Sequence, residues 1–174
     1  QRLRLPCLVA SRMWHPYPGE VVQQLAQAGV STVVSVPLAP YSVSLYHQEL
    51  APHCAKVGVR CLQCGPWNTE PALVDAFVEV IREALARLPT ESLATTSVLL
   101  TAHSLPTRVI AAGDRYEIDV RATAEAVAKA LGRPCELAFQ SQGMDGGEWL
   151  GPDLPTTFAR LAQSGVRQVV ACAI

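Results

Sequence analysis

The chain has 174 residues, enough to bury a sizeable core, and 49% of them are hydrophobic, as is typical of a globular protein. Its 14 lysines and arginines are balanced by 15 aspartates and glutamates, and the basic residues are scattered along the sequence. This balance argues against the clustered positive charge of a nucleic-acid-binding protein.

No apolar run approaches the roughly 18 to 20 residues that cross a bilayer, and the first residues lack the apolar segment of a secretory signal. We therefore expect a cytoplasmic protein whose six cysteines are reduced thiols. The pattern of Gln168–Ile174 is typical of a buried strand that ends without a turn, and Leu5–Ala10 is strand-like almost at the first residue. We expect further chain on both sides of the sequence.

Short runs of β-branched and aliphatic residues alternate with amphipathic stretches. The predicted strands, in chain order, are Leu5–Ala10, Thr32–Val36, Val59–Cys64, Val98–Ala102, Glu136–Phe139 and Gln168–Ala173. The predicted helices carry apolar residues at spacings of three and four, in sets that begin at Val21, Leu73, Val120 and Leu154. This alternation, with strands that are apolar on both faces, predicts an α/β fold of parallel sheets covered by helices.

A polar stretch after the long central helix is the predicted boundary between two α/β halves. It comprises residues 91–96, so residues 1–90 would belong to the first half and residues 97–174 to the second. In open α/β sheets, ligands bind beyond the carboxyl ends of the strands. The loops at these ends hold most of the Trp and His residues of the chain, which makes them the place to look for a site.

His103 directly follows the predicted strand Val98–Ala102, at the carboxyl edge of the sheet. Imidazole is a ligand for Fe(II) and a base that titrates near neutral pH. A histidine in this place could instead bond a neighbouring carbonyl and only complete the turn. No G-x-G-x-x-G, G-x-x-x-x-G-K-[ST] or G-x-S-x-G motif occurs, which disfavours dinucleotide binding, nucleotide hydrolysis and serine-hydrolase chemistry.

Three cysteines, Cys54, Cys61 and Cys64, include a C-x-x-C pair. Such a pair could bind a metal ion or, with a distant fourth thiolate, an iron–sulfur cluster. Because Cys61 and Cys64 fall in a predicted strand, we favour ordinary packing as small buried hydrophobes.

Six short motifs follow one another in a distinctive order. They are Arg12–Tyr17 (RMWHPY), Pro37–Ser42 (PLAPYS), Thr101–Pro106 (TAHSLP), Gly113–Tyr116 (GDRY), Phe139–Gly143 (FQSQG) and Glu148–Pro152 (EWLGP). This series resembles the signature of the ferrochelatases, lyases that insert ferrous iron into porphyrins during haem biosynthesis. The resemblance covers nearly the whole chain, and the series is far more diagnostic than any single motif.

The resemblance implies two Rossmann-like halves with a porphyrin cleft between them. It implies that His103 is the catalytic residue, which binds the metal and abstracts protons, and that Trp149 lines the cleft. Tyr46 is similar to a tyrosine that faces the macrocycle metal in the branch that uses coproporphyrin III. Ser42 and Ser141, within matched motifs, are expected to contact the substrate, which would be coproporphyrin III or protoporphyrin IX, with Fe(II) as the second substrate.

The chain also departs from the family pattern. The family's N-terminal segment, with an arginine and a tyrosine that contact the porphyrin, is not in this sequence. The segment expected after Ile174, where a glutamate faces the histidine, is not in it either. The cysteine-bearing form of the loop that animal enzymes with an iron–sulfur cluster possess is absent. We therefore expect no cofactor beyond the substrate Fe(II), with a [2Fe–2S] cluster left open but disfavoured.

Two alternatives remain open at this stage. A non-catalytic haem or tetrapyrrole-binding module would keep the cleft and lack the chemistry, and the residue facing His103 would discriminate it from an enzyme. A chelatase for another divalent metal, such as cobalt or nickel, would differ in metal specificity. The sequence indicates no nucleic-acid partner and leaves peripheral membrane contact and the oligomeric state open.

Overall fold

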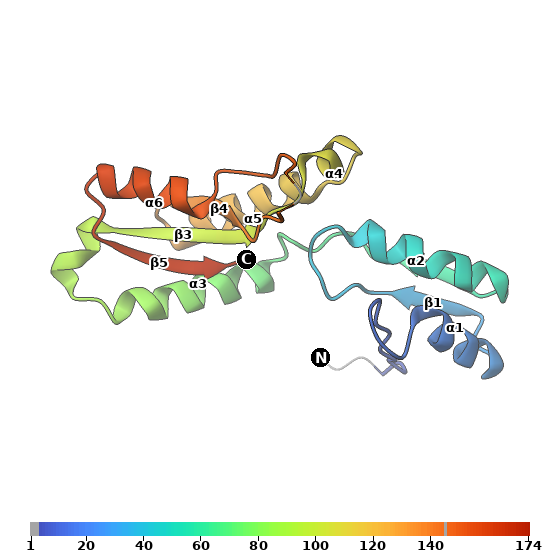
Figure 1. Ribbon diagram of the computed structural model, residues 1–174. Helices are drawn as coiled ribbons and strands as arrows, with labels where there is room; N and C mark the ends of the chain where they lie inside the picture. The colour runs from blue at the N-terminus through green and yellow to red at the C-terminus, as the bar shows by residue number, and fades with distance from the viewer. Residues whose placement is uncertain (1–3, 145) are drawn as a thin grey trace. The chain divides into compact units, whose positions relative to one another are not determined.

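The computed structural model describes residues 4–144 and 146–174, in which helices and parallel strands alternate (Figure 1). The chain forms two compact units, one that ends at Pro66 and one that comprises Trp67–Ile174. Each has its own parallel sheet with helices packed against it. The expected α/β class with parallel sheets is confirmed.

The described part of the first unit, residues 4–66, contains two helices and two strands. In chain order these are α1 (Pro18–Gln27), β1 (Thr32–Ser35), α2 (Val43–Lys56) and β2 (Arg60–Gln63). The strands pair in parallel, with Val33 opposite Cys61. Val22 of α1, Cys54 of α2 and Val59 form the buried cluster that joins the helices to the sheet. A proline at the first position of α1 fits there, because its missing N–H would have no partner within the helix.

The second unit contains a three-stranded parallel sheet in the order β4, β3, β5. Its elements, in chain order, are α3 (Pro71–Ala86), the short 3-10 helix η1 (Thr90–Thr95), β3 (Thr96–His103), α4 (Thr107–Ala111), α5 (Tyr116–Leu131), β4 (Cys135–Gln140), α6 (Leu154–Gln163) and β5 (Gln168–Ala173). Figure 1 shows α3 and α6 on opposite faces of this sheet. The central strand β3 is almost wholly buried until its last residue, as expected for a strand that is covered on both faces.

The units divide upstream of the predicted linker at residues 91–96. Helix α3 packs on α5 and β5, and its buried side chains Val74, Val78 and Ile81 join Val127 in one core cluster. Hydrophobic burial therefore ties α3 to the second sheet. Residues 90–95 form η1, which leads directly into β3 and separates no domains.

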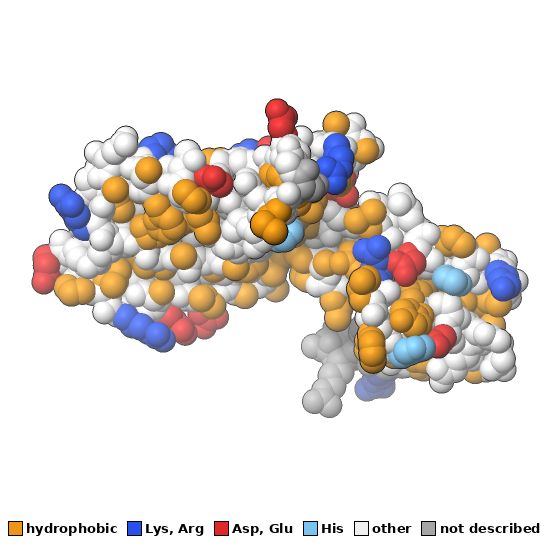
Figure 2. All heavy atoms as spheres, in the orientation of Figure 1, with side chains coloured by type: hydrophobic (Ala, Val, Ile, Leu, Met, Phe, Trp, Pro, Cys, Tyr) orange, Lys and Arg blue, Asp and Glu red, His pale blue; other side chains and the backbone are white. Residues whose placement is uncertain are grey.

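Leu5–Ala10, predicted as a strand, is irregular, so that prediction was wrong. Leu5 and Val9 are 68% and 73% exposed, and within the described chain no strand pairs with this segment. A strand forms where a neighbour accepts and donates its backbone hydrogen bonds. Other apolar side chains of the first unit, among them Val34, Val36 and Leu38, are exposed as well. Figure 2 shows hydrophobic side chains on the surface of this unit.

None of the helices in the described part of the chain is long and apolar enough to span a membrane. All six cysteines are free thiols. Cys54 is 1% exposed within α2. Burial, together with the neighbouring sulfur of Cys61, raises the pKa of the Cys54 thiol to about 11.

The raised pKa predicts that Cys54 is inert in the folded protein. A pKa of about 11 leaves on the order of one thiol in a thousand ionised at pH 8, and only the thiolate attacks an alkylating reagent. Iodoacetamide at pH 8, followed by peptide mass spectrometry, should label the exposed Cys7 first and spare Cys54. In guanidinium chloride all six cysteines should react, and labelling of Cys54 as fast as Cys7 without denaturant would contradict the prediction.

Candidate functional site

His103 is the last residue of β3, and its side chain is exposed at the carboxyl edge of the second sheet. In the parallel register it lies opposite Gln140, the last residue of β4. The Ser104 N–H donates to the Gln140 carbonyl at 2.7 Å, which continues the pairing one residue further. The Tyr116 hydroxyl donates to the His103 carbonyl at 2.8 Å. The histidine therefore extends toward solvent from a backbone that is held on two sides.

Ser104 connects this edge to the loop that follows β4. It is fully buried, and its hydroxyl donates to the Leu150 carbonyl at 2.9 Å. The Leu150 N–H donates to the Leu105 carbonyl at 2.9 Å, and Pro106 pairs with Trp149 in an antiparallel bridge. Two motifs that are far apart in the sequence, TAHSLP and EWLGP, are thereby brought side by side.

Trp149 is half-buried, and its indole ring lies against Gly143. A Cβ built on Gly143 would lie 2.6 Å from Cζ2 of Trp149, closer than any real Cβ contact, so only glycine leaves room for the ring. Ser141, between β4 and Gly143, is exposed. His103, Ser141 and Trp149 thus come from adjoining segments at one edge of one sheet.

Helix α5 packs on β4 of this sheet. Residues at its start, to which the sequence analysis gave no role, hold that start in place. Asp114 accepts the Tyr116 N–H at 2.8 Å, where α5 begins. One turn further, the Arg115 guanidinium lies 3.4 Å from the buried carboxylate of Asp119. Gly113 adopts a φ of +101°, which favours glycine, so the GDRY motif makes the turn into the helix.

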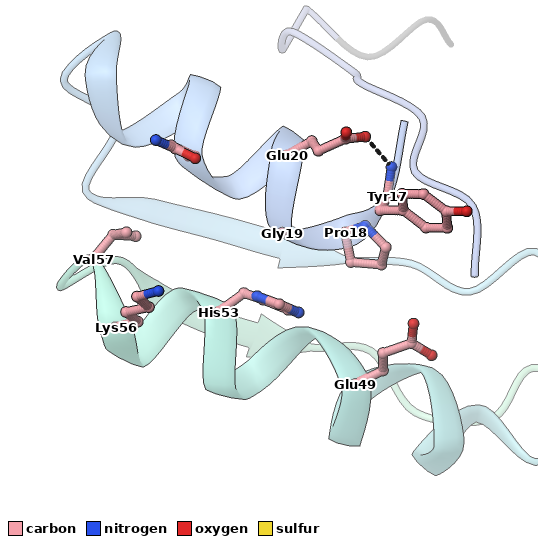
Figure 3. Close-up of a pocket in the computed structure, with 9 residues that line it drawn as sticks. Tyr17, Pro18, Gly19, Glu20, Glu49, His53, Lys56 and Val57 are labelled. Carbon is pink, nitrogen blue, oxygen red and sulfur yellow. Dashed lines mark hydrogen bonds between the residues drawn. The ribbon is translucent and has the colours of Figure 1, made fainter. Parts of the chain in front are cut away.

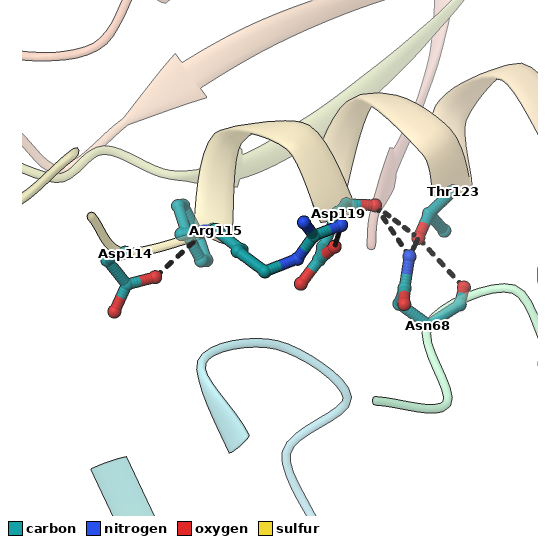
Figure 4. Close-up of polar contacts among 6 residues, drawn as sticks. Asn68, Asp114, Arg115, Asp119 and Thr123 are labelled. Atoms are coloured by element: carbon teal, nitrogen blue, oxygen red, sulfur yellow. Dashed lines mark hydrogen bonds and ion pairs between the residues drawn. The ribbon is translucent and has the colours of Figure 1, made fainter. Parts of the chain in front are cut away.

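A second set of polar contacts ties α5 to the segment before α3 (Figure 4). The buried Asn68 side chain donates to the Asp119 carbonyl at 2.8 Å. The Thr123 hydroxyl lies 2.8 Å from the Asn68 carbonyl and can donate to it. Buried polar groups cost free energy unless they are paired, and these three residues satisfy one another. Nothing in their spacing along the sequence predicts this network.

Ser42 and Tyr46, the other expected substrate contacts, belong to the first unit. Ser42 immediately precedes α2, and Tyr46 lies in the first turn of that helix. The Arg12 guanidinium lies 5.5 Å from the centre of the Tyr46 ring, and Arg12 also pairs with Glu49 of α2. Cation–π contact and ion pair together hold the RMWHPY segment against α2.

His47 fixes α2 to the carboxyl ends of both strands and was missed at the sequence level. It is buried, with Nε2 at 2.9 Å from the Cys64 carbonyl and Nδ1 at 3.0 Å from the Ser35 hydroxyl. Because a carbonyl only accepts, Nε2 carries the proton, and in the neutral ring Nδ1 accepts from Ser35. Ser42 and Tyr46 therefore stand on a helix start that is tied to its sheet.

Both serines expected to contact substrate have left-handed backbone. The φ of Ser42 is 49° and that of Ser141 is 63°, and they are the two non-glycine residues with positive φ in the described chain. Such backbone costs on the order of 1 kcal/mol or more and tends to occur at functional sites. The strain distinguishes these two serines from the other serines described.

A cavity of about 550 Å³ lies between α1 and α2 of the first unit (Figure 3). Glu20, Glu49 and His53 line it, but none of the predicted site residues does. Its carboxylates are already engaged, since His15 lies 3.0 Å from Glu20 and Arg12 pairs with Glu49. The Tyr17 N–H and His15 lower the pKa of Glu20, which keeps it ionised. This cavity therefore holds none of the candidate residues, and those of the second unit lie at the carboxyl edge of its own sheet.

Within the described residues, no group of three or more His, Cys, Asp or Glu side chains is arranged to hold a metal ion.

Comparison with known proteins identifies a protein family that this chain matches. The family model described as Ferrochelatase matches residues 1–174. The chain is 34% identical to a ferrochelatase of Herpetosiphon aurantiacus, over 91% of this chain and 54% of the relative. It is 34% identical to a ferrochelatase of Acidobacterium capsulatum, over 98% and 58%. It is 30% identical to a coproporphyrin III ferrochelatase of a Geobacillus species, over 85% and 50%. The chain spans about half the length of these relatives.

The contact of Trp149 with Gly143 can be tested by Gly143→Ala. The added methyl group cannot coexist with the ring at 2.6 Å, so the indole must move. The indole N–H resonance of Trp149, assigned from its loss in Trp149→Ala, should shift in the Gly143→Ala spectrum. Gly65→Ala is the control, because a Cβ at Gly65 meets nothing within 4 Å. An unchanged Trp149 resonance in Gly143→Ala would show that the ring lies elsewhere.

Proposed function

The chain belongs to the ferrochelatase family, and on this premise we propose that the natural protein containing it is a lyase that inserts Fe(II) into a porphyrin. The observation that carries the proposal is the exposed His103 at the end of a buried strand, with Ser141 and Trp149 at the same edge. The porphyrin is coproporphyrin III or protoporphyrin IX, and the process is haem biosynthesis.

His103 supplies the base that metal insertion requires. A free-base porphyrin loses two pyrrole protons as the iron enters, while ferrous iron exchanges its water ligands for pyrrole nitrogens. Imidazole can accept such a proton, and it can also ligate Fe(II) for a short time before transfer. The ring of His103 is exposed and so accessible to a bound macrocycle. The peptide between His103 and Ser104 is held in place, since the Tyr116 hydroxyl donates to its carbonyl and its N–H donates to the Gln140 carbonyl.

Trp149 supplies an aromatic wall for the macrocycle. Its ring is half-buried against Gly143, so it can present one surface to a planar ligand without much loss of side-chain freedom. A wall that holds the porphyrin bent would lower the barrier to metal entry, since a planar macrocycle resists it. Ser42, Tyr46 and Ser141 contact the substrate in this proposal, and the strained backbone of both serines supports their part in it.

The remaining parts of the proposal concern cofactor and compartment. The protein uses no cofactor beyond its substrate iron, and a [2Fe–2S] cluster stays disfavoured. We propose the cytoplasm as its compartment, because free thiols at all six cysteines suit a reducing environment.

Replacing His103 tests the proposed chemistry. In the natural protein, His103→Ala should keep its fold and much of its porphyrin affinity but lose metallation by about 100-fold or more, since alanine can neither accept a proton nor ligate iron. The rate is followed anaerobically with Fe(II) through the Soret band. The control is His53→Ala, which removes a histidine on α2 of the first unit.

Three outcomes separate the competing functions. Metallation by His103→Ala within a few-fold of wild type would contradict the catalytic role. A wild-type protein that binds porphyrin without metallating it would favour the non-catalytic binding module. Faster insertion of Co(II) or Ni(II) than Fe(II) would favour a chelatase for another metal.

Replacing Trp149 tests the aromatic wall. Trp149→Ala should weaken porphyrin binding by about fivefold or more, because an aromatic contact contributes on the order of 1 kcal/mol beyond the area that it buries. Porphyrin absorbance titration measures the affinity, and Phe158→Ala, which removes an exposed aromatic ring on α6, is the control. Equal affinities of Trp149→Ala and wild type would remove Trp149 from the site.

A further inference from the structure

The ring of His103 makes no hydrogen bond with any residue of 4–144 or 146–174, unlike its backbone. The backbone at the end of β3 therefore fixes where the Cα–Cβ bond of His103 points, and with it the region that the imidazole can reach. One hydrogen bond to that backbone comes from a side chain, the Tyr116 hydroxyl, which donates to the His103 carbonyl at 2.8 Å. Tyr116 is only 8% exposed, so the phenol that makes this bond is largely shielded from water.

Tyr116 is itself held in place. Its N–H donates to the Asp114 carboxylate at 2.8 Å, at the start of α5. Helix α5 packs on β4 and α3, and the contacts of Asp119 and Thr123 with Asn68 fix its first two turns. The phenol therefore extends from a rigid helix start to the last peptide of β3.

We propose that Tyr116 is a positioning residue for His103, an inference that rests on the proposed function. Its hydroxyl fixes the peptide that follows the His103 Cα and so keeps the imidazole aimed at the substrate. It does not touch the substrate itself. Catalytic groups must be held to about 0.5 Å, and a displacement of about 1 Å can cost on the order of 100-fold in rate. Loss of a hydrogen bond to the histidine backbone can allow a displacement of this size and so lower the rate.

Tyr116→Phe is the direct test, because it removes one oxygen and keeps the ring that packs beside β3. The matched control is Ser164→Ala, which removes a hydroxyl that likewise donates to a carbonyl, that of Leu161 at 2.9 Å, near the end of α6. Both variants are made in the natural protein that contains this chain. For each, the melting temperature, porphyrin affinity, KM and kcat of anaerobic Fe(II) insertion are measured.

We expect Tyr116→Phe to lower kcat by about 10-fold, with KM and porphyrin affinity within about twofold of wild type. Ser164→Ala should leave kcat unchanged even if its melting temperature falls as much. A kcat of Tyr116→Phe within twofold of that of Ser164→Ala would overturn the positioning role while leaving the proposed function intact.

A second readout does not depend on activity. The chain has four histidines, and the ring resonances of His103 can be assigned from their loss in His103→Ala. In Tyr116→Phe the His103 resonance should shift or broaden, whereas those of His15, His47 and His53 in the first unit should not. An unchanged His103 resonance would overturn the positioning role, whether or not the wild-type protein metallates porphyrin. Failure of the wild-type protein to metallate porphyrin would refute the proposed function and is measured separately.

Discussion

The parallel pairing of β3 with β4 determines where the candidate residues of the second unit lie. Because parallel strands end at the same edge, the register that sets His103 opposite Gln140 also lets the Ser104 N–H donate to the Gln140 carbonyl, immediately before Ser141. A shift of the strand register by one residue would turn His103, and every other side chain of β3, toward the opposite face of the sheet. Val98 and Leu100 pack in one core cluster with side chains of α3 and α5, and a shift would break these contacts.

Beyond the strand ends, the loops are held in place by buried hydrogen bonds and not by strand pairing. The Ser104 hydroxyl, wholly buried, holds the loop that carries Trp149 through the Leu150 carbonyl. Removing one partner of such a bond leaves a buried polar group unpaired and costs about 1 to 3 kcal/mol, which is more than the bond itself contributes. Position is thus enforced mainly by the penalty for leaving these groups unpaired, and the exposed side chains of His103 and Ser141 need few contacts of their own.

Much of the fold was predictable because parallel strands leave a strong hydrophobic signal. Local patterns predicted the strand before His103 and the position of this histidine at the strand's carboxyl end. The ordered motifs identified the other residues to examine. Helix α2 was not predicted, since it contains Pro52 and follows a proline-rich loop. The division at Pro66 could not be predicted from composition, because it depends on which sheet α3 packs against.

The residues that hold the candidate site residues in place could not be predicted from the sequence either. Tyr116 and His47 act through contacts with segments 13 and 17 residues away, and no periodic pattern encodes such a contact. The left-handed backbone of Ser42 and Ser141 was also unpredictable, because serine has no particular preference for it.

If His103 is the catalytic base, a porphyrin must meet it at the carboxyl edge of the second sheet. A crystal structure of the natural protein with a metal-free porphyrin bound tests this most directly. The macrocycle should contact the Trp149 ring, and the His103 imidazole should face the pyrrole nitrogens. A porphyrin bound elsewhere, for example in the cavity between α1 and α2, or one whose pyrrole nitrogens face away from His103, would show that His103 is not the catalytic base.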